Sequence, residues 1–199
     1  MTKIILINGP AGSGKDTVAS NLLTALPAGT AEIVKFAAPL KATAITLYCN
    51  GDSRKFYEFD NDQEKKNKPS AQFLGKSCRQ VQIDLSESYM KPMHGQTVFG
   101  ELLRNYIDTQ SDKGVETFLV SDSGFRPEAE VLVDYFGPQN VLLIRLHREG
   151  HTYEGDSRNY IDLDDLDVET VDIQNITDQF NESMTAVYIA VNKFLKGNK

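Results

Sequence analysis

Cysteine is scarce in this chain, because Cys49 and Cys78 are the only two among 199 residues. Their separation matches no common metal-ligand spacing, and two cysteines are too few for a disulfide framework. We therefore expect reduced thiols and a cytoplasmic location.

The sequence also lacks an apolar run of membrane-spanning length, and its first residues lead directly into a predicted strand. A membrane-spanning helix needs about 20 consecutive apolar residues. We expect neither export nor insertion into a membrane. A single compact domain covering residues 1–199 suits this length and the hydrophobic fraction of 40%.

Basic residues are not in excess, since 21 Lys and Arg stand against 28 Asp and Glu and the formal net charge is −7. Proteins that bind duplex nucleic acid usually present a net basic face. The charge therefore neither requires nor supports a nucleic-acid partner, although a local basic patch can lie within an acidic total.

What the sequence does contain is a glycine-rich loop between the apolar run at 4–7 and the helix-compatible stretch at 18–23. Glycines let successive backbone N–H groups point at phosphate oxygens, and the helix adds its positive N-terminal end. Lys15 supplies a mobile ammonium for the β- and γ-phosphates. This succession of strand, glycine-rich loop and helix predicts a P-loop, and the alternative is a chance glycine-rich turn. The residues expected to hold the phosphates are Gly9, Ala11, Gly12, Ser13, Gly14, Lys15, Asp16 and Thr17.

The residue after the lysine departs from the usual P-loop pattern, which places Ser or Thr there to hold magnesium. Here Asp16 comes first and Thr17 one place later. Nucleoside monophosphate kinases of the adenylate kinase kind also have a non-hydroxyl residue followed by threonine at this point, so the loop resembles that of small-molecule kinases. Asp16 and Thr17 are accordingly candidate metal ligands.

Apolar runs and helical periodicity indicate alternating strands and helices, which is typical of a parallel sheet with right-handed crossovers. The predicted strands are 4–7, 31–37, 116–122, 140–146 and 170–175. The predicted helices after the loop helix are 39–48, 71–89, 97–107, a segment from about 127, and a closing helix at 178–195.

The strand at 116–122 ends in an acid, Asp122. Ligands of open α/β sheets collect at the carboxyl ends of strands, so Asp122 is expected beside the P-loop, either holding magnesium or orienting the acceptor hydroxyl as a base. The alternative is an N-cap of the helix near Pro127, a role that Ser123 can fill equally well. Arg126 is close enough along the chain to reach the same phosphates.

A polar segment at 147–162 follows the fourth strand and is expected to act as a lid. Arg148 and Arg158 are its candidate catalytic arginines, because arginines from a mobile segment stabilise the charge of phosphoryl transfer. The alternative is a pair of solvated loop arginines. His147 and His151 have metal-like spacing without an evident third ligand. The acidic stretch 162–167 is expected to be a solvated loop.

An insertion at about 50–112 separates the second and third strands. Its first part, 50–70, is polar and predicts a surface excursion, with a substrate-binding role as the alternative. The guanidinium of Arg79 suits the oxygens of a monophosphate, unless it is a surface arginine. Weaker candidates of the same kind are Ser86, Glu87, Lys91 and Arg104.

Several stretches together resemble the phage deoxynucleoside monophosphate kinase-like P-loop kinases. The stretches that carry this resemblance are 14–19, 36–41 and 120–130, with weaker similarity at 86–92, 98–100 and 155–161. The resemblance implies a three-layer α/β fold with a central parallel sheet, inserted acceptor-binding helices and a small lid. It also implies transfer from ATP, with Mg²⁺, to a deoxynucleoside monophosphate. The expected location is the host cytoplasm if the chain is phage-encoded, and a homodimer is one candidate assembly.

One departure from the family concerns Arg126, because the family often has its arginine two places after the strand-end aspartate. Here Ser123 and Gly124 follow the aspartate, and the arginine comes later, at Arg126. This different spacing affects the expected geometry of the acceptor site.

Two alternatives to a free nucleotide kinase remain. The same lineage includes phage kinases that phosphorylate the hydroxymethyl group of 5-hydroxymethyluracil in DNA, and such an enzyme needs a basic rim beside the flipped base. The residues that can supply this rim are Arg54, Lys55, Lys65, Lys66, Lys68 and Lys76. The other alternative is a non-catalytic nucleotide-binding module, in which Asp122 and the arginines would be idle.

Overall fold

The computed structural model describes residues 2–175 and 180–197. The chain divides into two compact units, the first made of Met1–Phe36 and Gly100–Lys199 and the second of Ala37–Phe99. The insertion was expected at about 50–112, but the second unit begins and ends earlier. The reason is that Ala44 and Cys49 pack in one core cluster with Phe56 and Phe73, so the first helix of this region belongs with the insertion.

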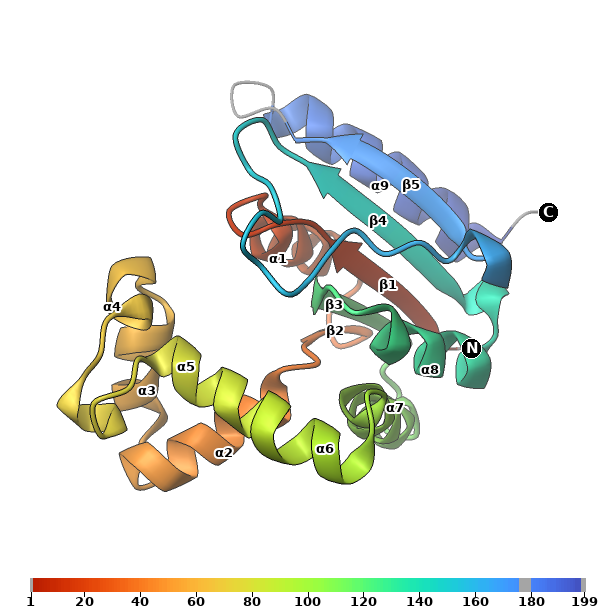
Figure 1. Ribbon diagram of the computed structural model, residues 1–199. Coiled ribbons are helices and arrows are strands. Elements are labelled where there is room, and N and C mark those ends of the chain that lie inside the picture. The colour runs from red at the N-terminus through yellow and green to blue at the C-terminus, as the bar shows by residue number, and fades with distance from the viewer. Residues whose placement is uncertain (1, 176–179, 198–199) are drawn as a thin grey trace. The chain divides into compact units, whose positions relative to one another are not determined.

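The first unit is built on a five-stranded parallel sheet with the order β2-β3-β1-β4-β5 (Figure 1). The strands are β1 (Lys3–Asn8), β2 (Ala31–Val34), β3 (Thr117–Ser123), β4 (Val141–His147) and β5 (Glu169–Gln174). The five predicted strands and their parallel arrangement are confirmed. Because β1 lies between β3 and β4, the loop that leaves β1 emerges at the middle of the carboxyl edge.

Helices cover both faces of this sheet, as the completely buried run Ile4–Ile7 requires. Helices α1 (Lys15–Ala25) and α9 (Phe180–Lys196) share one core cluster with the strands. Helix α8 (Arg126–Phe136) packs against β4 and lies on the opposite face from α9 (Figure 1). Most of α7 (Val98–Ser111) also belongs to this unit. The first two residues of the predicted closing helix, 178–179, lie outside the described residues.

Two short 3₁₀ turns complete the first unit, η3 (Pro138–Asn140) before β4 and η4 (Asp164–Leu166) before β5. Between His147 and η4 the chain has neither helix nor strand. Within the described residues, no helix has the length and apolar character needed to cross a membrane.

The second unit is helical. Its elements are α2 (Ala38–Cys49), α3 (Ser53–Asp60), α4 (Gln63–Asn67), the 3₁₀ turn η1 (Ala71–Phe73), α5 (Cys78–Ile83), the π-helical segment η2 (Asp84–Met90) and α6 (Lys91–His94). Most of the stretch 50–70 is exposed, as expected of a polar surface excursion, but it is largely helical. Side chains of Asp52 and Asp62 cap two helices there, and Phe56 is completely buried.

The helix predicted from residue 71 begins only at Cys78, because the Ser77 side chain caps it and Leu74 and Gly75 adopt positive φ before it. It then continues past Pro92 to His94 and ends at Gly95, which has φ 90°. The wide π turn, in which the Lys91 N–H bonds the Ser86 carbonyl, precedes the proline. Helix and π turn together bring residues 86–91 onto one continuous element.

Candidate functional site

The glycine-rich loop joins β1 to α1, as the sequence predicts. Gly12 and Gly14 have φ of 78° and 95°, the left-handed region in which a side chain is strained. Gly14 is the N-cap of α1 and gives the helix no side-chain cap. The first N–H groups of α1 are therefore not taken by a capping side chain, and they carry the positive end of the helix dipole.

Basic side chains bind four consecutive carbonyls of this loop. Lys15 donates from Nζ to the first two, at 2.6 and 2.7 Å, and two residues of the segment after β4 donate to the next two. The bonds are Lys15 to Gly9 and Pro10, His151 Nδ1 to Ala11 at 2.9 Å, and Arg148 Nη1 to Gly12 at 2.7 Å. The loop and the predicted lid segment are thus in direct contact.

Lys15 lies in a cluster of charged groups. Burial and, to a smaller extent, the neighbouring Arg158 guanidinium lower the pKa of its ammonium to about 8. The carboxylates of Asp16, Asp122 and Asp156 act in the opposite direction. Lys15, Asp122 and Arg158, which are far apart in sequence and were predicted as catalytic, are therefore close enough to interact.

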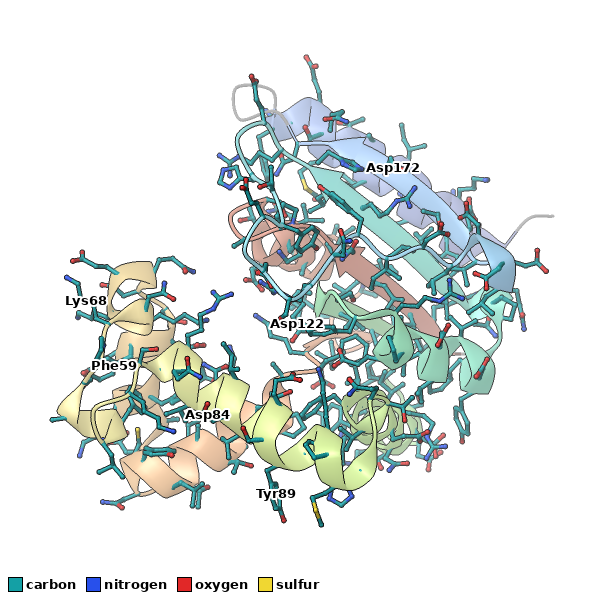
Figure 2. All side chains as sticks on the ribbon, viewed as in Figure 1. Phe59, Lys68, Asp84, Tyr89, Asp122 and Asp172 are labelled. Carbon is teal, nitrogen blue, oxygen red and sulfur yellow. The ribbon has the colours of Figure 1, made fainter. Side chains whose placement is uncertain are left out.

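Asp122 lies at the carboxyl end of β3 (Figure 2). Its Oδ1 accepts a hydrogen bond of 2.9 Å from the Phe36 backbone N–H. The alternative role as N-cap is wrong, because the N-cap of α8 is Phe125 and it makes no side-chain capping bond. The carboxylate instead lies at the sheet edge near Lys15.

Asp16 is held at the same edge by two donors on its Oδ1, Lys35 Nζ at 2.7 Å and Ser121 Oγ at 2.9 Å. Burial tends to raise the pKa of the Asp16 carboxyl, but the bonds from Lys35 and Ser121 keep it below its ordinary value. Thr17 follows on the exposed side of α1. Carboxylate and hydroxyl oxygens are hard ligands of the kind that Mg²⁺ prefers, so the donor set of Asp16, Thr17 and Asp122 fits that ion.

Arg158 makes a bidentate ion pair with Asp156, with N···O distances of 3.0 and 2.6 Å. This pair raises the pKa of the guanidinium, against the effect of burial. The stem of Arg158 runs across Gly124, where an added Cβ would lie 2.6 Å from the arginine Cδ. A side chain at position 124 would therefore displace the arginine.

Two asparagines that sequence reasoning missed hold the loop and the lid segment in place. Asn8, completely buried at the end of β1, donates to the Ser123 carbonyl and the Tyr153 hydroxyl and accepts from the Ile161 N–H. Asn175, which follows β5, donates to the Ser13 carbonyl at 2.6 Å. The only sequence signal was a polar residue at the end of an apolar strand.

Beside the loop lies a cleft of about 400 Å³. Its wall contains a stacked pair of rings, His147 and Tyr160, with centroids 4.5 Å apart. Asp172 on β5 (Figure 2) binds His147 and pairs with Arg145. The residues that line the cleft are His147, Arg148, Glu149, His151, Thr152, Tyr153, Asn159, Tyr160 and Gln174.

His147 and His151 have different partners, Asp172 and the Ala11 carbonyl respectively. In the described parts of the chain, no group of three or more His, Cys, Asp and Glu is arranged to hold a metal ion. The shared metal site that their spacing suggested is therefore not formed in this structure.

Arg126 and Arg104 are placed differently from the phosphate-binding role considered for them. Arg126 is held by the carboxylates of Glu130 and Asp165, each at 2.6 Å. It would have to leave both to reach a phosphate. Arg104 pairs with Glu101 at 3.1 Å and lies over the Tyr135 ring, so it links α7 to α8.

The π-helical segment of the second unit brings three predicted acceptor residues together. Ser86 Oγ and Lys91 Nζ both donate to Oε1 of Glu87, at 2.9 and 2.7 Å. Lys91 and Ser86 are buried, whereas the Glu87 side chain is 51% exposed. Arg79, the fourth candidate of this unit, lies half-buried in the first turn of α5.

No protein-family model and no characterised protein sequence matches this chain. Among solved structures, the chain is similar to a sugar kinase from Janibacter sp. HTCC2649, determined without ligand. The two share 15% sequence identity with a TM-score of 0.50, over 96% of this chain and 95% of that one. The fold is kinase-like. At this identity the likeness concerns the fold alone, so membership of the phage deoxynucleoside monophosphate kinase family stays a prediction.

Proposed function

We propose that this protein is an ATP-dependent phosphotransferase whose glycine-rich loop is a P-loop. The observation that carries the proposal is the convergence of Lys15, Asp122 and Arg158 beside an uncapped helix N-terminus, at the carboxyl edge of a parallel sheet. Phosphoryl transfer depends mainly on positioning and electrostatic stabilisation, for which this set of groups is suited.

The donor nucleotide would bind in two parts. Its phosphates would lie on the N–H groups of the loop and α1, with Lys15 turning from the Gly9 and Pro10 carbonyls toward the β- and γ-phosphates. Its base would enter the adjoining cleft, where the stacked rings of His147 and Tyr160 offer an aromatic wall.

The catalytic groups have distinct tasks in this proposal. Lys15 and Arg158 stabilise the negative charge on the transferred phosphoryl group, and Arg148 joins them from the lid segment. Asp122 either accepts the proton of the attacking hydroxyl or binds the metal. Asp16, Thr17 and Asp122 would hold Mg²⁺, which neutralises phosphate charge when it is bound.

For the acceptor we propose a free deoxynucleoside monophosphate. The second unit has nine Lys and Arg against seven Asp and Glu, a formal charge of only +2. Carboxylates within the same unit pair with most of the cations that a basic rim for DNA would use. The pairs are Arg54 with Asp52, Lys66 with Asp60, Lys68 with Glu64, and Lys76 with Asp84. This internal pairing supports a small acceptor over a DNA strand.

The test is a transfer assay with labelled ATP and Mg²⁺ against each deoxynucleoside monophosphate and against DNA containing 5-hydroxymethyluracil. We expect label in a deoxynucleoside diphosphate and none in polymer. Lys15→Ala should abolish transfer while its circular dichroism spectrum and melting temperature stay near those of the wild type. Label only in DNA would reject the proposed acceptor, and a fully active Lys15→Ala protein would reject the proposed donor site.

A further inference from the structure

A tight turn after β4 aims two side chains at the glycine-rich loop. The turn is closed by a hydrogen bond of 3.1 Å from the His151 N–H to the Arg148 carbonyl. Gly150 supplies its positive φ of 75°, which a side chain at that position would strain. Arg148 and His151 then bind adjacent loop carbonyls, those of Gly12 and Ala11.

The His151 ring lies directly against the backbone of Gly12. A Cβ added to Gly12 would lie 2.5 Å from the ring Cε1 and 2.6 Å from Nδ1, so only glycine leaves room for the imidazole. A carbonyl oxygen can only accept, so the Nδ1 that approaches Ala11 at 2.9 Å carries a hydrogen. The ring therefore covers the loop and also donates a hydrogen bond to it.

Fixing one carbonyl of a trans peptide also fixes the N–H that follows it. The C=O of Ala11 and the N–H of Gly12 belong to one planar group and point in opposite directions. With the carbonyl held toward His151, the Gly12 N–H is turned away from the ring. The histidine thereby restricts rotation of the Ala11–Gly12 peptide plane, which would otherwise let this N–H point in several directions.

We propose that His151 is a positioning residue that orders the Ala11–Gly12 peptide of the loop for an anionic phosphate ligand. The inference rests on the proposed function for the identity of that ligand, though not for the ordering itself. Without the imidazole the loop samples more conformations. The apparent affinity for phosphate then falls in proportion to the fraction of molecules whose loop is in the binding conformation. Loss of one neutral hydrogen bond corresponds to an affinity that is weaker by about fivefold.

Three variants separate this role from simple packing. His151→Ala removes both the ring and the hydrogen bond. His151→Asn keeps a donor N–H at the δ position and should restore much of the effect. His94→Ala, a change of an exposed histidine at the end of α6 in the second unit, serves as the control for loss of a histidine.

The experiment has one readout without ligand and one with ligand. In the free protein, NMR relaxation should show a lower order parameter for the Gly12 N–H in His151→Ala, and near wild-type values in His151→Asn and His94→Ala. In calorimetry, the Kd of ATP and of inorganic pyrophosphate should rise about fivefold in His151→Ala, while kcat at saturating ATP changes less than twofold.

Each other outcome has a definite meaning. An unchanged order parameter at Gly12 and an unchanged Kd in His151→Ala would overturn the positioning role. An Asn variant as defective as the Ala variant in both readouts would also overturn it, because the bond to Ala11 would then be irrelevant. A lower order parameter at Gly12 in His151→Ala, with no ATP binding by the wild-type protein, would support the ordering role and reject the proposed function.

Discussion

The amide of Asn8 donates a hydrogen bond to the hydroxyl of Tyr153, which lies 2.9 Å away across a sequence distance of 145 residues. The Ser123 and Asn159 carbonyls lie 2.8 and 3.1 Å from the same nitrogen, so its two N–H groups are shared among three acceptors. Burial raises the pKa of Tyr153 to about 12, so its hydroxyl stays neutral at physiological pH. One buried side chain thus joins the end of β1, the end of β3 and the lid segment.

Asn8→Asp should destabilise the protein, because a carboxylate cannot donate to the two carbonyls that the amide satisfies. Leaving buried carbonyls unpaired and burying a charge costs about 2 to 4 kcal/mol. Urea unfolding measures the change, with Asn67→Asp as the control, since Asn67 is an exposed asparagine that bonds only within its own helix region. An equal, small effect of both substitutions would argue against an anchoring role for Asn8.

A second prediction concerns Asp60, whose side chain is 3% exposed and accepts hydrogen bonds from Lys41 at 2.6 Å and Lys66 at 2.8 Å. Burial tends to raise the pKa of Asp60, but the bonds from the two lysines lower it to about 2. Since this pKa lies below the unfolded value, the stabilisation is present above about pH 4 and is lost as pH falls toward 2.

Asp60→Asn should therefore lower the free energy of unfolding by about 3 to 5 kcal/mol near pH 7, the range found when one partner of a buried ion pair is removed. The difference from wild type should shrink as unfolding is repeated at acidic pH. Glu58→Gln, an exposed change on the same helix α3, is the control. A pH-independent difference would contradict the role of the charge.

The order of the strands and the residues that hold the loop illustrate what sequence reasoning could and could not reach. Apolar runs and turn residues are local signals, so all five strands and the loop helix were predicted. The placement of β1 between β3 and β4 depends on pairing between distant segments, which no spacing reports. The anchors Asn8 and Asn175 act on partners more than 100 residues away, and neither belongs to a local motif.

The second unit was harder to predict for a different reason. Phe56 lies among charged residues, so the stretch around it looks polar although the ring is completely buried. The π-helical segment Asp84–Met90 also departs from the 3.6-residue period of an α-helix, although Glu87 and Lys91 still pair at the ordinary i,i+4 spacing. Arg126 was predicted near the phosphates from chain proximity, whereas Glu130 and Asp165 determine its position.

A third prediction follows from the lowered pKa of Lys15, about 8. If the charged ammonium binds phosphate, kcat/KM for ATP should fall tenfold per pH unit above about pH 8, because kcat/KM reports the free enzyme. Lys15→Arg should lose this decline, since arginine stays charged over the whole range. A flat wild-type profile from pH 7 to 10 would contradict the assignment.

The same ionisation affects stability with a defined sign. The folded pKa of Lys15 lies below the ordinary value of 10.5, so the unfolded chain binds this proton more tightly. The contribution of Lys15 to stability should therefore increase as pH rises from about 8 to 10.5. Urea unfolding of the wild type and Lys15→Met over this range measures the difference.

A fourth prediction separates the charge of Asp122 from its hydrogen bond. In Asp122→Asn the amide oxygen can still accept from the Phe36 N–H, so the fold should be kept. Loss of the base or metal ligand should lower kcat by about 100-fold or more. Asp134→Asn, an exposed change on α8, should leave kcat unchanged. A destabilised Asp122→Asn protein with wild-type turnover would assign Asp122 a structural role only.

The last prediction tests Glu87, which the π-helical segment presents in an unusual way. Its Oε1 is held by two buried donors, Ser86 and Lys91, while the carboxylate itself is half exposed. A carboxylate fixed in this manner can accept a hydrogen bond from a nucleotide's sugar hydroxyl or base N–H without first being ordered.

Glu87→Gln keeps an oxygen for both buried donors but takes the Glu87 charge away from the buried Lys91 ammonium, so the melting temperature should fall and binding is compared at a temperature where both proteins are folded. Loss of a charge-assisted bond should raise the KM of the deoxynucleoside monophosphate about tenfold and leave the KM of ATP unchanged. Glu64→Gln is a matched control, because Glu64 also pairs with a lysine four residues later, Lys68, but both side chains are exposed. Equal acceptor KM values for the two variants would mean that Glu87 serves only to neutralise Lys91.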